Sequence, residues 1–242
     1  MALLPSVLPK HINKHMAVLL CNLSQQFLDA DAISVLLSGS VLRGDSLPLS
    51  DLDLYLRMAG EFTSEDEELA AYALIAHKIT WPTIPEIYQA GVSGIQVRFL
   101  GAKRYPKGLI IAIAGEDWIP EPSTDDALIK EAHDRLEDFP HPPRYYYEYL
   151  LHAGLDWAIR LPRLVMIDVF PLLRFLLIKE GFNPTNVWQM PKREVIAKFP
   201  IATSYWRLLW DINPLLPDPN KGLQCALAGI ELMEHFLSRE IH

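Results

Sequence analysis

The chain has 242 residues, of which 50% are hydrophobic and 21% are charged, and its formal net charge is −8 with a pI near 5.5. This length and composition are typical of a globular protein with a sizeable core, in one large or two modest domains, and they exclude a disordered chain. The acidic balance argues against a broad nucleic-acid surface, so a nucleic-acid partner is not expected.

Membrane-spanning segments and disulfide bonds are also not expected. No stretch approaches the roughly 20 apolar residues that span a bilayer, because the longest candidate, residues 165–178, is interrupted by two charged residues and a proline. The first ten residues form too short an apolar run for a signal peptide, and a cytoplasmic location follows as the expectation. Cys21 and Cys225 lie in predicted helices of apolar rhythm, which indicates core thiols in a reducing compartment.

The first predicted element is a helix from Pro9 to about Leu28. Apolar residues recur along it at helical spacing, and proline is favoured at the first position of a helix. His11 and His15 are four residues apart on this helix, as in some metal sites. No further ligand type is nearby in the sequence, so two surface histidines are expected.

Two strands joined by a polar loop follow. Residues 33–37 form an apolar run typical of a buried strand, which ends at Gly39 and Ser40. Residues 51–57 alternate strictly between polar and apolar side chains, which predicts a half-buried strand. Residues i and i+2 of a strand share a face with Cα atoms roughly 6.5–7 Å apart. Asp51 and Asp53 are therefore expected to project together, while the leucines between them point into a core.

This arrangement suggests binding of a metal ion and a phosphate. Two carboxylates at that separation can share a divalent cation, or part of a two-metal site with ions about 3.5–4 Å apart. A glycine at position 39 lets the backbone approach a phosphate without a Cβ in the way. The amides and the hydroxyl around Ser40 would supply hydrogen-bond donors. An acidic pair alone is equally typical of a solvated strand face, so the interpretation depends on the three features occurring together.

The stretch from Leu37 to Tyr55 resembles the signature of the nucleotidyltransferase superfamily that includes DNA polymerase β, and most closely its aminoglycoside (kanamycin-type) members. The matching pieces are a strand, Gly39-Ser40, Arg43-Gly44 and Ser50-Asp51-Leu52-Asp53. The resemblance implies transfer of a nucleoside monophosphate from ATP, or another nucleoside triphosphate, to a hydroxyl of a small aminoglycoside-like molecule, with Mg²⁺ as cofactor. It assigns metal binding and catalysis to Asp51 and Asp53, and nucleotide binding to Gly39, Ser40, Arg43 and Ser50.

Helix and strand signals alternate after this signature. Thr63 or Ser64 in front of an acidic run predicts a helix to about His77. Residues 84–90 and 94–100 flank a Gly-Val-Ser turn and are predicted to form a hairpin, and residues 109–114 form a further short strand. These elements together predict a small mixed sheet with helices packed against it.

The resemblance also implies a third carboxylate on the strand after the signature. The predicted strand 94–100 carries Gln96 at that position, with Arg98 on the same face. A glutamine offers a carbonyl oxygen to a cation, but it brings no charge and cannot act as a general base. Glu86, on the predicted partner strand, is the nearby acid that would replace it.

The remainder of the chain is predicted to be helical. Prolines between Phe139 and Pro143 mark the predicted boundary, with a nucleotidyltransferase domain at residues 1–140 and a helical domain at 141–242. The expected helices run from Ser123 or Thr124 to about Asp138, from Arg144 to about Arg160, from Pro162 to Glu180, from Pro191, from Pro200 to Asp211, and from Asp218 or Pro219 to Ile241. The predicted fold is α+β, a mixed-sheet domain followed by an all-helical bundle domain, with the active cleft between them.

Two residues of the helical half receive roles from the resemblance. Glu148 lies where the kanamycin-type enzymes carry a catalytic base, although a second alignment places Leu151 there. Lys192 and the adjacent Arg193 lie where related proteins have a basic residue that reaches the nucleotide phosphates. Ordinary exposure in the first turn of a helix is the alternative for both basic residues.

The sequence therefore predicts one of two functions. The first is a Mg²⁺-dependent nucleotidyltransferase, whose partners are a nucleoside triphosphate and a small-molecule acceptor, with a protein or RNA acceptor as the variant. The second is a nucleotide-binding or regulatory module that keeps the fold and has lost the chemistry, which Gln96 favours. Self-association as a homodimer is left open as a further partnership.

Overall fold

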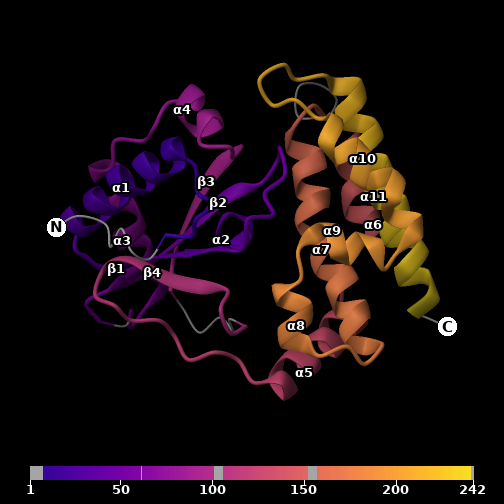
Figure 1. Cartoon of the computed structure of the whole chain (residues 1–242), viewed down its shortest axis with the longest axis horizontal. Coiled ribbons are helices and arrows are strands. Elements are labelled where there is room, and N and C mark those ends of the chain that lie inside the picture. Colours follow the sequence, from indigo (N-terminus) through magenta and orange to yellow (C-terminus); the bar gives the residue numbers. More distant parts are fainter. Residues whose placement is uncertain (1–7, 61, 101–105, 152–156, 241–242) are drawn as a thin grey trace. The chain divides into compact units, whose positions relative to one another are not determined.

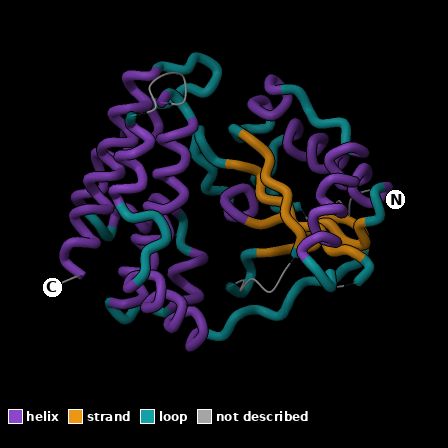
Figure 2. Tube along the Cα trace, turned by 180° about the vertical axis from the view of Figure 1, so that it is seen from behind, coloured by secondary structure: helices purple, strands orange, loops and turns teal. Residues whose placement is uncertain are grey.

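The computed structural model of the protein describes residues 8–60, 62–100, 106–151 and 157–240 (Figure 1). The chain divides into two compact units: the sheet unit, Met1–Ser46 with Asp51–Pro122, and the helical unit, Leu47–Ser50 with Ser123–His242. The described strands all belong to the sheet unit, as the colours of Figure 2 show. The predicted α+β class is confirmed.

The sheet unit is built on four strands in the order β3-β2-β1-β4. Strand β1 pairs antiparallel with both β2 and β4, whereas β2 and β3 are parallel. The elements of this unit are α1 (Lys14–Asp29), β1 (Ala32–Ser38), α2 (Gly39–Arg43), β2 (Asp51–Met58), α3 (Glu65–Lys78), α4 (Ile84–Gln89), β3 (Gly94–Phe99) and β4 (Ile110–Gly115).

Alternation along the strands separates the two faces of this sheet. Leu52, Leu54 and Leu56 of β2 are buried in a core that also takes in side chains of α1 and α3. Tyr55, between two of these leucines, instead packs with Leu36 in a small second cluster. Because successive side chains of a strand point to opposite faces, Asp51 and Asp53 lie on the face of Tyr55. The predicted inward leucines and outward aspartates are thus confirmed.

Helix α1 begins later than predicted. Its first residue is Lys14 rather than Pro9. The side chain of Asn13 accepts a hydrogen bond of 2.8 Å from the amide of Met16 and so caps the N-terminal end of the helix. Asparagine is among the best residues at this capping position, since its side-chain oxygen satisfies an amide that has no partner inside the helix.

The predicted hairpin of residues 84–90 and 94–100 is wrong. Residues Ile84–Gln89 form helix α4, and β3 is parallel to β2. Thr83 and Glu86 form a capping box at the start of α4. A parallel pair needs a crossover connection of a dozen or more residues, and the segment that contains α3 and α4 supplies it. Glu86 therefore lies on a helix and not on a strand beside β3.

The helical unit buries a core along α7 and α11. Its elements are α5 (Asp125–Glu137), α6 (Pro143–Leu150), α7 (Arg160–Lys179), α8 (Pro184–Gln189), α9 (Lys192–Ala197), the 3₁₀ turn η2 (Pro200–Ala202), α10 (Thr203–Asp211) and α11 (Pro219–Glu240). Leu47 and Leu49, from the loop in front of β2, are buried in this core. None of the described helices is long and apolar enough to cross a membrane.

The boundary between the two units and the length of helix α6 differ from the predictions. The compact units divide between Pro122 and Ser123, so α5 belongs to the helical unit, whereas the sequence suggested a boundary near residue 140. Helix α6 ends at Leu150, which makes the prediction of one continuous helix to Arg160 wrong. Residues 152–156 of that prediction lie outside the described residues.

The two thiols are expected to differ in reactivity. Cys225 is fully buried, and burial raises the pKa of its thiol to about 12, whereas Cys21 is half-buried. Because the thiolate is the reactive form, a thiol reagent at pH 8 should label Cys21 in the native protein and Cys225 only after denaturation. A Cys21→Ser variant should then show no native labelling, and equal labelling rates at both sites would contradict the assigned burial.

Candidate functional site

Strand pairing brings two pieces of the predicted signature, the Gly39 turn and Asp53, together inside the sheet unit. Ser38, the last residue of β1, pairs directly with Asp53 of β2, so Gly39 follows immediately beside that carboxylate. On the other side of β2, Asp53 pairs with Gln96 of β3. Thus a glycine, an aspartate and a glutamine that are far apart in sequence lie side by side.

The backbone at Gly39 explains why only glycine fits there. Its φ is +75°, and a Cβ built at this position would lie 2.0 Å from Oδ2 of Asp53. The space beside Gly39 is therefore taken up by the carboxylate of Asp53. This differs from the expected reason, which was close approach of a phosphate, and it makes Gly39 and Asp53 a coupled pair.

Helix α2 is a single turn with a compact polar loop after it. Ser40 is buried, its carbonyl accepts a hydrogen bond of 3.0 Å from the amide of Asp45, and its hydroxyl accepts one of 3.4 Å from Ser46. Gly44 ends the turn in the left-handed region with φ of 73°. The signature loop is thus held by its own hydrogen bonds.

Arg43 is bound within the same loop. Its Nε donates to both carboxylate oxygens of Asp45 at 3.2 Å, and the two side chains are 14% and 7% exposed. The guanidinium charge is therefore balanced locally. A role of Arg43 in contacting a nucleotide remains a prediction, and the observed contact is with Asp45 of the same loop.

His11 contributes to this region, and sequence analysis missed it. Its Nε2 hydrogen-bonds to the carbonyl of Val41 at 2.8 Å, and its ring lies so close to Gly44 that a Cβ there would be 3.1 Å away. The segment before α1 therefore contacts α2 through a hydrogen bond. No local pattern could reveal a contact between positions thirty residues apart.

The side-chain atoms on this face that could bind a metal ion are oxygens. Asp51 and Asp53 share the face with Gln96, and Arg98 pairs with Tyr55 two residues further along. Carboxylate and amide oxygens suit a hard cation such as Mg²⁺. Among the described residues, no three His, Cys, Asp or Glu side chains come together as a metal-binding group. The two aspartates with the carbonyl of Gln96 thus fit one divalent ion better than two.

Glu86 is not the missing third acid. Its carboxylate accepts hydrogen bonds from the amide and the hydroxyl of Thr83, at 2.7 and 2.8 Å, in the capping box of α4. These bonds lower the pKa of Glu86. The side chain is therefore an ionised helix cap, and the earlier expectation that it faces β3 from a partner strand is wrong.

Ser50 and Lys192 belong to the helical unit. The hydroxyl of Ser50 accepts hydrogen bonds from the amide of Leu47 at 2.8 Å and from Nζ of Lys192 at 3.2 Å. Lys192 is 6% exposed, and its ammonium lies 5.5 Å from the centroid of the Phe170 ring. Ordinary first-turn exposure, the alternative considered for this lysine, is excluded by this burial.

Glu148 lies on the surface of α6. Its side chain is 65% exposed and forms an ion pair of 3.4 Å with Arg144, one turn earlier. The alternative residue, Leu151, is 83% exposed. The structure of the helical unit thus places Glu148 in a solvated ion pair, and its role as a base remains a prediction.

A second polar cluster lies in the helical unit. Oδ2 of Asp168 accepts a hydrogen bond from the hydroxyl of Tyr146 and lies 2.8 Å from Nδ1 of His141. Burial, with the hydrogen bond to Asp168, raises the pKa of Tyr146, so its hydroxyl stays protonated. The signal in the sequence was an aspartate inside the apolar run of residues 165–178.

Comparison with protein-family models found no match for this chain, and a search of curated proteins found no significant match.

Proposed function

We propose that the protein is a nucleotidyltransferase of the DNA polymerase β superfamily, which moves a nucleoside monophosphate from ATP to a hydroxyl of a small molecule of aminoglycoside type. The observation that carries this proposal is the close fit of Gly39, directly after β1, against the carboxylate of Asp53 on the neighbouring strand β2, with Asp51 on the same face of β2. A solvated acidic strand would not require a glycine fitted against one of its carboxylates.

In this proposal, Asp51 and Asp53 hold a divalent ion on the outer face of β2. Bound Mg²⁺ neutralises charge on the transferring phosphate and lowers the pKa of the attacking hydroxyl. The amides of Gly39 and Ser40 are assigned by this proposal to the phosphates of the leaving pyrophosphate. The roles of Ser50, Lys192 and Glu148, which belong to the helical unit, remain predictions from the resemblance.

The second candidate is a nucleotide-binding protein of the same fold without transfer activity. The register of β2 and β3 favours it, because an uncharged glutamine stands beside Asp53. Two carboxylates hold a second divalent ion poorly. Arg98, on the same face, adds positive charge but cannot activate a hydroxyl as a metal ion does.

Titration calorimetry with ATP, with and without Mg²⁺, followed by an assay of pyrophosphate release, separates the two candidates. Acceptors to be compared are an aminoglycoside, a tyrosine-containing protein and an RNA end. Mg²⁺-dependent ATP binding with release of pyrophosphate supports the enzyme. Mg²⁺-dependent binding without release supports the second candidate, and absence of Mg²⁺-dependent ATP binding would contradict both.

Replacing Gln96 by aspartate should strengthen Mg²⁺ binding. The added carboxylate would lie in register with Asp53, and a third negative charge holds divalent ions more firmly. We expect at least a ~5-fold rise in Mg²⁺ affinity, measured by calorimetry in the presence of ATP, and faster transfer if an acceptor is turned over.

Gln96→Asn is the matched control for this prediction, because it shortens the side chain as aspartate does without adding charge. It should leave Mg²⁺ affinity unchanged or weaker. Brisk transfer by the natural protein, slowed by Gln96→Asp, would show that the acid ligand lies elsewhere.

A further inference from the structure

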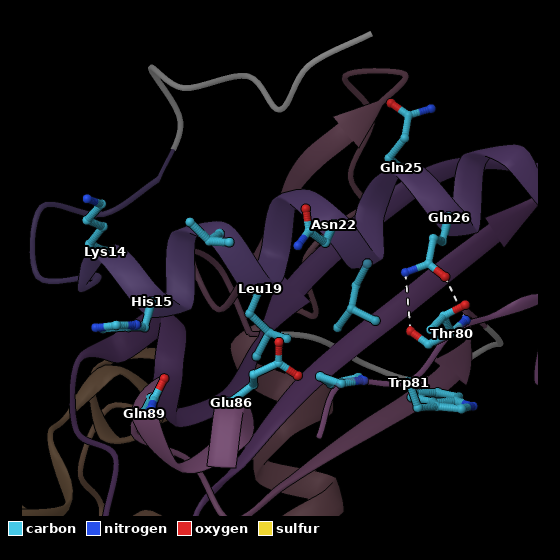
Figure 3. A pocket seen from close by; sticks show the side chains of 13 residues that line it. Lys14, His15, Leu19, Asn22, Gln25, Gln26, Thr80, Trp81, Glu86 and Gln89 are labelled. Atoms are coloured by element: carbon cyan, nitrogen blue, oxygen red, sulfur yellow. Dashed lines mark hydrogen bonds between the residues drawn. The ribbon is translucent and has the colours of Figure 1, made fainter. Parts of the chain in front are cut away.

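A pocket of the sheet unit lies outside the proposed transfer site and contains none of the predicted signature residues. It has a volume of about 680 Å³ and lies between α1, the segment Thr80–Pro82 and α4 (Figure 3). This volume is in the range of small-molecule sites. The pocket therefore needs an explanation separate from the proposed transfer site.

The apolar part of this pocket consists of buried leucine side chains and an exposed aromatic ring. Leu19 and Leu23 of α1 are buried below it, whereas Trp81 is 45% exposed and Pro82 lies next to it. An indole is a large apolar surface with a flat face on which another ring can stack. Exposed aromatic surface beside an apolar floor is typical of a ligand site.

The backbone in front of Trp81 is held by hydrogen bonds to α1. The side-chain amide of Gln26 on α1 accepts a hydrogen bond of 2.6 Å from the amide of Thr80 and donates one of 3.3 Å to its carbonyl, as the dashed lines of Figure 3 show. This two-point contact fixes the backbone one residue before Trp81. Less ordering is then needed on binding, which favours affinity.

The polar part of the pocket carries a fixed carboxylate and an amide. Glu86 extends from α4 toward Leu19 and Asn22 in Figure 3. One of its oxygens accepts both hydrogen bonds from Thr83, which fixes the orientation of the carboxylate. Asn22 is exposed on α1 and offers both a donor and an acceptor.

We propose that this pocket binds a purine nucleoside whose base carries an exocyclic amino group, that is, an adenine base. The ring stacks on Trp81, the amino group donates to Glu86, and the amide of Asn22 pairs with the adjacent edge of the base. Asparagine is suited to the adenine edge because it accepts from N6 and donates to N7. Stacking of a base on an aromatic side chain supplies much of the affinity in such sites. The proposal does not depend on the nucleotidyltransferase assignment.

The test is titration of the full chain with adenosine in the absence of divalent ions, followed by calorimetry. Trp81→Ala should weaken adenosine binding at least 10-fold, which equals about 1.4 kcal/mol, and Trp81→Phe should restore most of the affinity because it keeps a ring. Trp118→Ala is the matched control, since Trp118 is an exposed tryptophan of the same unit that stacks under Arg57. It should bind adenosine as the natural protein does.

The charge of Glu86 is tested with inosine, which has a carbonyl oxygen where adenosine has the amino group. The natural protein should bind inosine at least 5-fold more weakly than adenosine. Glu86→Gln should remove or reverse this difference, because the glutamine oxygen remains in the capping box and its NH₂ group, a donor, then faces the base. Glutamine keeps the capping box of α4, so the helix should remain intact. Equal binding of both nucleosides by the natural protein would overturn the assigned role of Glu86.

Asp53→Asn separates this proposal from the proposed function. Adenosine binding should be unchanged in that variant, whereas Mg²⁺-dependent ATP binding should be lost. Absence of adenosine binding up to millimolar concentration, or unchanged binding by Trp81→Ala, would overturn the second site and leave the transfer site unaffected.

Discussion

Replacing Asp53 by asparagine should leave the protein folded and remove its Mg²⁺-dependent nucleotide binding. Asparagine has the shape of aspartate, so the fit against Gly39 is kept and the free energy of unfolding should change by less than about 1 kcal/mol. The loss of one of two carboxylates removes a charge that the bound ion requires. Since a bound metal ion is worth several kcal/mol of transition-state stabilisation, any transfer rate should fall at least ~100-fold.

The measurements are calorimetry with ATP and Mg²⁺, the pyrophosphate-release rate and a melting curve. Asp66→Asn is the matched control, because it makes the same change of charge on the exposed first turn of α3. It should behave as the natural protein. Unchanged Mg²⁺ affinity in a folded Asp53→Asn protein would contradict the assignment of the site.

The second large effect is expected at Gly39. A side chain there meets two obstacles, a φ of +75° and the carboxylate of Asp53 at 2.0 Å from the added Cβ. The backbone conformation alone costs about 1–3 kcal/mol for a residue other than glycine. Gly39→Val should therefore lower the melting temperature and, by displacing Asp53, also remove Mg²⁺-dependent ATP binding.

A double-mutant cycle identifies which obstacle dominates. Gly39→Ala should destabilise the natural protein more than it destabilises an Asp53→Ala variant, because the carboxylate that meets the added Cβ is then absent. A coupling free energy of at least about 0.5 kcal/mol is expected from denaturant unfolding. The same cost in both backgrounds would show that backbone conformation alone requires the glycine.

Part of the fold was predictable because it depends on neighbours in sequence. Alternating polar and apolar residues predicted β2 with its buried leucines, and the observed strand is Asp51–Met58. The sequence narrowed two helix caps to Thr63 or Ser64 and to Ser123 or Thr124. In the structure Ser64 and Thr124 are the caps, and each accepts a hydrogen bond from the amide three residues later. A capping hydrogen bond spans one turn, so its signal lies within four consecutive residues.

The helix at residues 84–89 shows how such local signals compete. Glycine and apolar residues around 91–93 suggested a hairpin, yet Thr83-Ile84-Pro85-Glu86 carries the Thr-x-x-Glu pattern of a capping box. In the structure the capping pattern prevailed, since residues Ile84–Gln89 are helical and β3 pairs with β2 instead. Strand direction depends on the whole sheet and has no local pattern.

By itself, the sequence determined the strand that carries Asp51 and Asp53, the glycine after β1 and the absence of an acid at Gln96. These features follow from side-chain periodicity and residue identity, which are properties of short segments. Only the tertiary structure decided that the carboxylate of Asp53 fills the space beside Gly39 and that His11 contacts the carbonyl of Val41. It also decided that Gln26 and Glu86 line one pocket. Each of these depends on backbone geometry or on a contact between positions that no short pattern relates, because packing is set by the assembled strands and helices.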